Sequence, residues 1–92
     1  MLMKISIDTV AALGLLLKAT RMAQRMTRDE ISLATGLSPA FISNVEAGKE
    51  TAQIGKVLNL MRELGIQITG EAAGIDDILP RLKTGGHRRL RK

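Results

Sequence analysis

Apolar residues recur at helical spacing along several stretches of the chain, and short segments rich in glycine or polar residues separate them. The first stretch predicts a helix that is capped by Asp8 or Thr9 and runs to about Ala23. Its apolar face consists of Val10, Leu13, Leu16 and Leu17. Ahead of it, residues 1–7 alternate between apolar and polar, which is typical of a short strand or a frayed arm.

Residues 27–48 predict two short helices joined by a tight turn. The first helix is expected over 28–35, because Thr27 can cap it and Glu30 follows at capping-box spacing. Gly36 comes where this helix should end and supplies the positive φ that such an end often needs.

The second short helix is expected over 39–46, with Ser38 as its cap and Pro39 at its first position, where a missing N–H costs nothing. The apolar residues that can hold the two helices against a third are Ile31, Leu37, Ile42 and Val45. This pattern predicts a helix-turn-helix unit, which places its second helix in the major groove of DNA.

A fourth helix is expected over 52–64, capped by Thr51 and terminated by Gly65. The residues at core spacing are Ile54, Val57, Leu58, Met61 and Leu64.

The four residues after Gly65 alternate between apolar and polar and predict a strand. They are Ile66, Gln67, Ile68 and Thr69. One short strand is not stable alone, so it needs a partner: residues 1–7 of the same chain, the same strand of a second copy, or both. Antiparallel pairing with its own copy would give a two-fold homodimer.

Three regions are expected along the chain. They are an N-terminal arm or short strand over 1–8, a helix-turn-helix DNA-binding domain over 9–70 and a flexible basic C-terminal tail over 71–92. One or two amphipathic turns, interrupted at Pro80, are expected within it from Ile75, Ile78, Leu79 and Leu82. Residues 81–92 hold six basic residues and no acid, whereas residues 1–80 hold eight basic and nine acidic residues. The positive net charge of the chain therefore comes from residues 81–92.

The composition fits one small domain of 92 residues with an aliphatic core, because Phe41 is the single aromatic residue. The chain has no cysteine, so neither a disulfide framework nor a thiolate metal site is expected, and we expect no metal and no cofactor. His87 lies in the basic tail and is expected to be solvated. No apolar run is long enough to span a membrane, and a cytoplasmic location is expected, at the nucleoid when the protein is bound to DNA.

These motifs resemble the Xre family, the lambda-repressor-like and Cro-like DNA-binding domains. The matching positions near the N-terminus are Leu13, Gly14, Leu17 and Arg21. Those around the second motif helix are Gly36, Leu37, Ser38, Ile42, Ser43, Glu46 and Gly48. The likeness covers about residues 9–69 and implies a mainly α, lambda-repressor-like domain of four to five helices with a short C-terminal dimerisation strand.

The start of the second motif helix faces the base edges in this kind of fold. The candidate base contacts are therefore Ser38, Pro39, Ala40, Ser43 and Asn44. Asn44 can form two hydrogen bonds with adenine, and Pro39 or Ala40 can contact a thymine methyl group. Because this helix has no arginine, we expect the protein to depend strongly on DNA shape and on water-bridged contacts.

Candidate phosphate contacts lie at the start of the first motif helix and in the loop after the second, where free N–H groups or lysine favour anions. They are Thr27, Arg28 and Lys49, with Arg25 and Lys18 as weaker candidates. Arg28 stands where the family usually has glutamine. The resemblance also implies a buried ion pair between Arg21 and Glu46.

Within the Xre family the arrangement is most similar to HipB-like antitoxins. That resemblance implies a homodimeric repressor that binds a palindromic operator in its own promoter, with a HipA-like serine/threonine kinase toxin as partner. A stand-alone Xre-type or phage-type regulator without a toxin is the alternative, and an interaction module that no longer binds DNA is a third hypothesis. An enzyme is not expected, because the sequence offers no metal-ligand cluster, nucleophile–base pair or phosphate-binding glycine loop.

Overall fold

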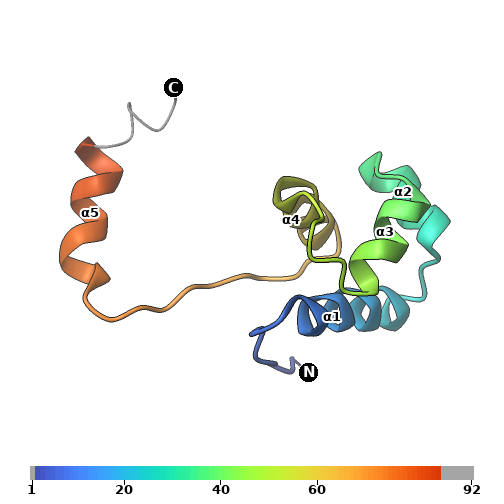
Figure 1. Cartoon of the computed structure of the whole chain (residues 1–92), viewed down its shortest axis with the longest axis horizontal. Coiled ribbons are helices and arrows are strands. Elements are labelled where there is room, and N and C mark those ends of the chain that lie inside the picture. The colour runs from blue at the N-terminus through green and yellow to red at the C-terminus, as the bar shows by residue number, and fades with distance from the viewer. Residues whose placement is uncertain (1, 86–92) are drawn as a thin grey trace.

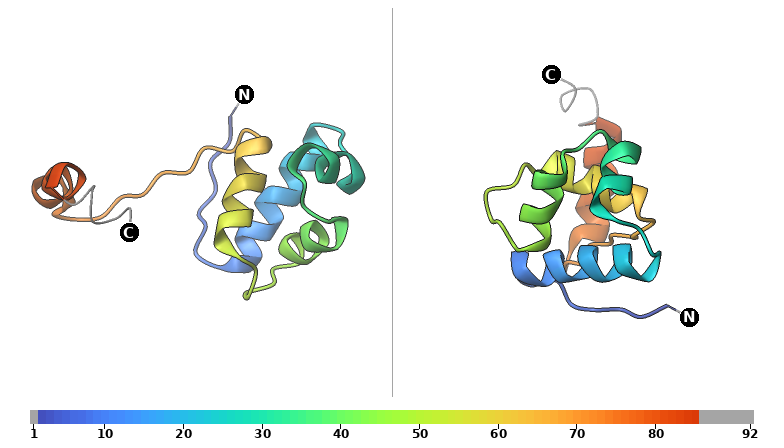
Figure 2. Two further views of the ribbon diagram at one scale, coloured as in Figure 1. Left: turned by 90° about the horizontal axis from the view of Figure 1, so that it is seen from above. Right: turned by 90° about the vertical axis from the view of Figure 1, so that its right-hand side faces the viewer.

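Five α-helices follow one another along residues 2–85, which are the residues that the computed structural model describes (Figure 1). They are α1 (Val10–Ala23), α2 (Arg28–Thr35), α3 (Pro39–Glu46), α4 (Ile54–Glu63) and α5 (Ile75–Gly85). The first four pack into a bundle, and α5 lies apart from it at the end of an extended segment (Figures 1 and 2). The mainly α fold class is therefore confirmed. No helix in this part of the chain is long and apolar enough to cross a membrane.

The two motif helices begin as their sequences predict. Thr27 Oγ1 accepts the N–H of Glu30 at 3.1 Å, and the Glu30 carboxylate accepts the N–H of Thr27 at 2.8 Å, which completes the capping box. Gly36 ends α2 with a φ of 78°. Ser38 Oγ accepts the N–H of Phe41 at 3.0 Å and caps α3.

For the other two bundle helices, α1 and α4, the sequence did not determine the first residue correctly or uniquely. Thr9, not Asp8, caps α1 and accepts the N–H of Ala12 at 3.0 Å. The prediction that Thr51 caps the fourth helix was wrong, because α4 begins at Ile54 with Gln53 as its N-cap. Ala52, which packs against the core, belongs to the turn before the helix and not to the helix.

The core lies between α1, α2, α3 and α4. Its buried apolar residues are Leu17, Ile31, Leu37, Ile42, Val45, Val57, Leu60, Met61 and Leu64. The apolar face predicted for α4 was partly wrong: Ile54 and Leu58 are 66% and 41% exposed, and Leu60 is 1% exposed. Both sides of α4 carry apolar residues, so only its packing against the bundle decides which side is buried.

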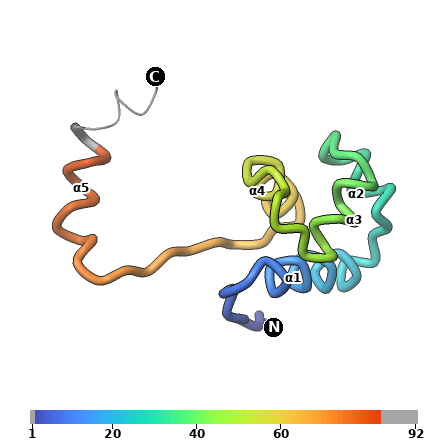
Figure 3. Tube along the Cα trace, viewed as in Figure 1, coloured from blue at the N-terminus to red at the C-terminus, as the bar shows by residue number. Residues whose placement is uncertain are grey.

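Glycine lets α1 and α3 approach closely where the end of α3 meets α1 (Figure 3). A Cβ atom on Gly14 would lie 2.6 Å from the carbonyl oxygens of both Val45 and Glu46. Gly48, which follows α3 with a φ of 87°, lies against the backbone of Ala11. The glycine of the first motif therefore serves helix packing.

The segment after α4 differs from its prediction. Gly65 ends α4 with a φ of 75°, as expected, and the N–H of Ile66 donates to the carbonyl of Met61 at 2.9 Å. Residues 66–69 then form no strand, and residues 2–7 do not pair with them. Pairing within the chain was therefore the wrong alternative, and pairing with a second copy stays a prediction.

The region predicted as a flexible tail contains a regular helix. Helix α5 spans eleven residues and continues past Pro80, where an interruption was expected. The proline leaves the carbonyl of Asp76 without its helical donor, but this helix is exposed and water can bond that carbonyl. The predicted tail residues 86–92, with His87, lie outside the described residues.

Candidate nucleic-acid interface

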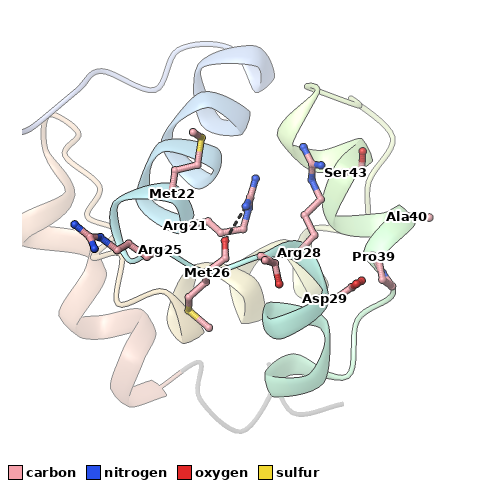
Figure 4. Close-up of a pocket in the computed structure, with 10 residues that line it drawn as sticks. Arg21, Met22, Arg25, Met26, Arg28, Asp29, Pro39, Ala40 and Ser43 are labelled. Atoms are coloured by element: carbon pink, nitrogen blue, oxygen red, sulfur yellow. Dashed lines mark hydrogen bonds between the residues drawn. The ribbon is translucent and has the colours of Figure 1, made fainter.

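The end of α1 and the starts of α2 and α3 surround an open hollow (Figure 4). Its lining consists of Arg21, Met22, Arg25, Met26, Thr27, Arg28, Asp29, Pro39, Ala40 and Ser43. The predicted phosphate contacts in this lining are Arg25, Thr27 and Arg28. The predicted base contacts in it are Pro39, Ala40 and Ser43. The fold thus brings candidate contacts of both kinds to one surface, and Arg25 extends to the opposite side of it from Arg28 (Figure 4).

The floor of this hollow is held by a buried ion pair. Arg21 Nε donates to Glu46 Oε2 at 2.7 Å, and Arg21 Nη2 donates to Glu46 Oε1 at 3.1 Å. Arg21 Nη1 donates to the carbonyl of Met26 at 2.8 Å (Figure 4). One arginine therefore joins α1 to the end of α3 and to the loop that leads into α2.

Arg28 contributes a second cation to the same carboxylate, a contact that was not predicted from the sequence. Its Nε donates to Glu46 Oε1 at 3.1 Å, and its side chain remains 40% exposed. Within residues 2–85, no protein acceptor bonds its two terminal amino groups. The contact fixes the guanidinium at one edge and leaves its outer edge available. The only sequence signal was an arginine in place of the usual glutamine.

The charges of this cluster shift two pKa values. Burial alone would raise the pKa of Glu46, but the hydrogen bonds and charges of Arg21 and Arg28 outweigh it and lower that pKa. The hydrogen bond to Glu46 raises the pKa of Arg21 despite its burial. Two guanidinium groups therefore face one carboxylate at neutral pH, and the hollow keeps a net positive charge.

A second, smaller hollow lies between α3 and the start of α4. Its lining consists of Phe41, Asn44, Lys49, Thr51, Ala52, Gln53 and Lys56. It brings the predicted base contact Asn44 together with the predicted phosphate contact Lys49. Lys56, which was not predicted as a contact from the sequence, also lines this hollow, with its Nζ 5.7 Å from the centre of the Phe41 ring. Its position in the first turn of a helix was the available signal.

Two proposed contacts lie in neither hollow. Ser38 is exposed at the start of α3, where its hydroxyl is used as the helix cap. Lys18 is exposed on α1. The structure therefore concentrates the candidate contacts around α3 and the first turn of α2.

A helix-turn-helix family model matches residues 17–70, which contain α2, α3 and α4. The chain therefore belongs to the helix-turn-helix family of DNA-binding transcriptional regulators. It is 43% identical over 68 residues to the uncharacterized HTH-type transcriptional regulator y4mF of Sinorhizobium fredii (strain NBRC 101917 / NGR234). This match covers 74% of the present chain and 90% of the relative.

Solved structures share the fold at low sequence identity. An MDT protein and a HipB–O4 20mer complex each match with a TM-score of 0.70 and 21% identity. A HipA–HipB–O2–O3 complex matches with the same TM-score and 20% identity. Each match covers 76% of the present chain and 99% of the matched chain.

Proposed function

We propose that this protein is a sequence-specific repressor that binds a palindromic operator as a homodimer in the cytoplasm, with α3 in the major groove. The observation that carries the proposal is the hollow to which the start of α2 contributes Thr27 and Arg28 and α3 contributes Ser43. In a helix-turn-helix domain the start of the second helix faces base edges while the first helix lies across the backbone. The protein is proposed as a binding protein and not as an enzyme.

Base discrimination is assigned to α3. Ser43 and Asn44 are adjacent and exposed, and neither forms a side-chain hydrogen bond within the described residues. Asn44 suits adenine, and Ser43 can donate or accept. Because α3 contains no basic residue, a share of the specificity is assigned to the shape and deformability of the operator.

Phosphate binding is assigned to two places on either side of α3. Arg28 and the capped start of α2 provide the first, with N–H groups and a fixed guanidinium. Lys49, Lys56 and the start of α4 provide the second, where Gln53 forms no side-chain cap. The two places would contact the DNA backbone on both sides of the major groove that α3 occupies.

Replacing Arg28 with alanine is expected to weaken DNA binding about tenfold and to lower the salt slope by about one, equally for specific and unrelated duplexes. The change in folding stability should stay below about 1 kcal/mol, because the side chain is partly exposed. Fluorescence anisotropy titrations at several salt concentrations measure the slope. Arg28→Lys is the matched control, because it keeps the positive charge and loses the planar guanidinium with its paired N–H donors. An unchanged salt slope in Arg28→Ala would show that Arg28 does not contact DNA phosphate.

The partner is proposed to be a HipA-like serine/threonine kinase, which would make this protein the antitoxin of a toxin–antitoxin pair that represses its own operon. The support is the fold shared with solved structures that are described as a HipB–O4 20mer complex and a HipA–HipB–O2–O3 complex. A stand-alone regulator is the alternative, favoured by the 43% identical relative, whose name mentions regulation alone.

Affinity purification of the tagged chain from its native cells, followed by identification of bound protein and DNA, separates these functions. A stoichiometric kinase-like protein together with DNA from upstream of the gene would support the antitoxin. DNA without a protein partner would overturn the kinase proposal and leave a stand-alone regulator. A protein partner without DNA would overturn the repressor.

A further inference from the structure

Helix α5 has an apolar stripe that the bundle does not cover. The stripe consists of Ile75, Ile78, Leu79 and Leu82, each about half exposed and none part of the core. These residues follow one another at helical spacing, so they share one side of the helix. Figures 1 and 2 show α5 separated from α1–α4 by an extended segment. An eleven-residue helix that contains Pro80 is too short to be stable in water on its own, so its stripe needs a partner surface.

The spacing of the stripe is the same in both directions along the helix. Ile75 is three residues from Ile78, and Leu82 is three residues from Leu79. In an antiparallel pair of α5 helices, Ile75 of one copy would therefore lie beside Leu82 of the other, and Ile78 beside Leu79. A two-fold interface requires such a self-complementary surface.

The charges along one edge of the stripe fit the same arrangement. Asp76 and Lys83 are exposed and seven residues apart, so they lie along the same edge. An antiparallel pair brings the first turn of one helix beside the last turn of the other. Asp76 then faces Lys83 of the second copy, and Lys83 faces its Asp76. In a parallel pair the two Asp76–Lys83 edges would lie on opposite sides of the interface, so these ion pairs could not form.

We infer that α5 is a self-association helix, which pairs antiparallel with α5 of a second copy through this apolar stripe and two Asp76–Lys83 ion pairs. The surface is separate from the hollow beside α3 and from residues 66–69. It acts without DNA, so the inference does not depend on the function proposed above.

Charge exchange in the full chain tests the pairing by sedimentation equilibrium in the absence of DNA. Asp76→Lys and Lys83→Asp each replace two attractive contacts with two repulsive ones and should each weaken association about tenfold. An equimolar mixture of the two variants, and the double variant that carries both changes, restore opposite charges and should associate like wild type. The matched controls Glu71→Lys and Lys4→Asp make the same charge changes outside α5 and should have no effect.

Disulfide trapping tests the orientation, since the chain has no native cysteine. A mixture of Asp76→Cys and Lys83→Cys chains should form mixed disulfides, while each variant alone should not. The two cysteines of a paired variant would lie about 8 Å apart along the pair for Asp76→Cys and about 14 Å apart for Lys83→Cys. Disulfides within each variant alone, single charge variants that associate like wild type, or no restoration in the double variant would overturn the inference.

Discussion

Replacing Glu46 with alanine is expected to lower the free energy of unfolding by about 3–5 kcal/mol. The carboxylate is 3% exposed and is the acceptor for both Arg21 and Arg28. Its loss leaves the buried guanidinium of Arg21 without a counter-charge, and that is more costly than the loss of any one hydrogen bond. Urea unfolding followed by circular dichroism measures the change.

The paired replacement distinguishes a buried charge from lost packing. A chain with both Arg21→Met and Glu46→Leu buries no charge at this place, so it should regain most of the stability that Glu46→Ala loses. If Glu46→Ala costs less than about 1 kcal/mol, or if the paired replacement is as unstable as the single variant, the ion pair is not what joins α1 to α3.

The carboxylate of Glu46 is also expected to make the free energy of unfolding depend on pH. The folded-state pKa of Glu46 is lowered, so its contribution to stability is fully present above the ordinary glutamate pKa of about 4.3 and is lost as the pH falls toward the folded value. Between roughly pH 5 and pH 3 the wild type should therefore lose more stability than Glu46→Gln. If the free energy of unfolding changes with pH in the same way for both proteins, Glu46 is not the cause of the pH dependence.

Gly14→Ala is expected to cost about 3 kcal/mol or more, the second large effect. The new methyl group would lie 2.6 Å from the backbone oxygens of Val45 and Glu46, and backbone cannot rotate out of the way as a side chain can. Helices α1 and α3 would have to separate, which would also pull Arg21 from Glu46. Thermal and urea unfolding of the purified variant measure the loss.

Gly55→Ala is the matched control for this change. Gly55 lies in α4, has no atom within 4 Å of its added Cβ, and has no positive φ. Its replacement should stabilise the protein by up to about 1 kcal/mol, because alanine favours helix over glycine. Equal effects of the two replacements would mean that the contact between α1 and α3 is looser than described.

The two motif helices could be predicted from sequence because their starts depend on residues no more than three positions apart. Thr27 with Glu30 and Ser38 with Pro39 determine where α2 and α3 begin, without help from the rest of the chain. The buried side of α4 could not be predicted this way. Leu58 and Leu60 are both apolar, and the packing of α4 against the rest of the bundle decides that Leu60 is covered.

The sequence predicted which residues belong to the candidate site, but not how their side chains contact one another. Family spacing nominated Arg28 and Ser43, and the fold placed them on one hollow. The contact of Arg28 with Glu46 joins residues eighteen positions apart and depends on the angle between two helices. Helix α5 was missed as a continuous element because a proline usually interrupts a helix, and the tolerance of this one depends on its exposure.

Selection of bound sequences from a random duplex library, with the wild-type chain and with a Ser43→Ala and Asn44→Ala double variant, tests the central claim that α3 recognises operator DNA. The wild type should enrich a two-fold symmetric sequence. The double variant should keep its circular dichroism spectrum and its salt-dependent binding but enrich no sequence. An unchanged enriched sequence in the variant, or no DNA binding by the wild type, would contradict the account.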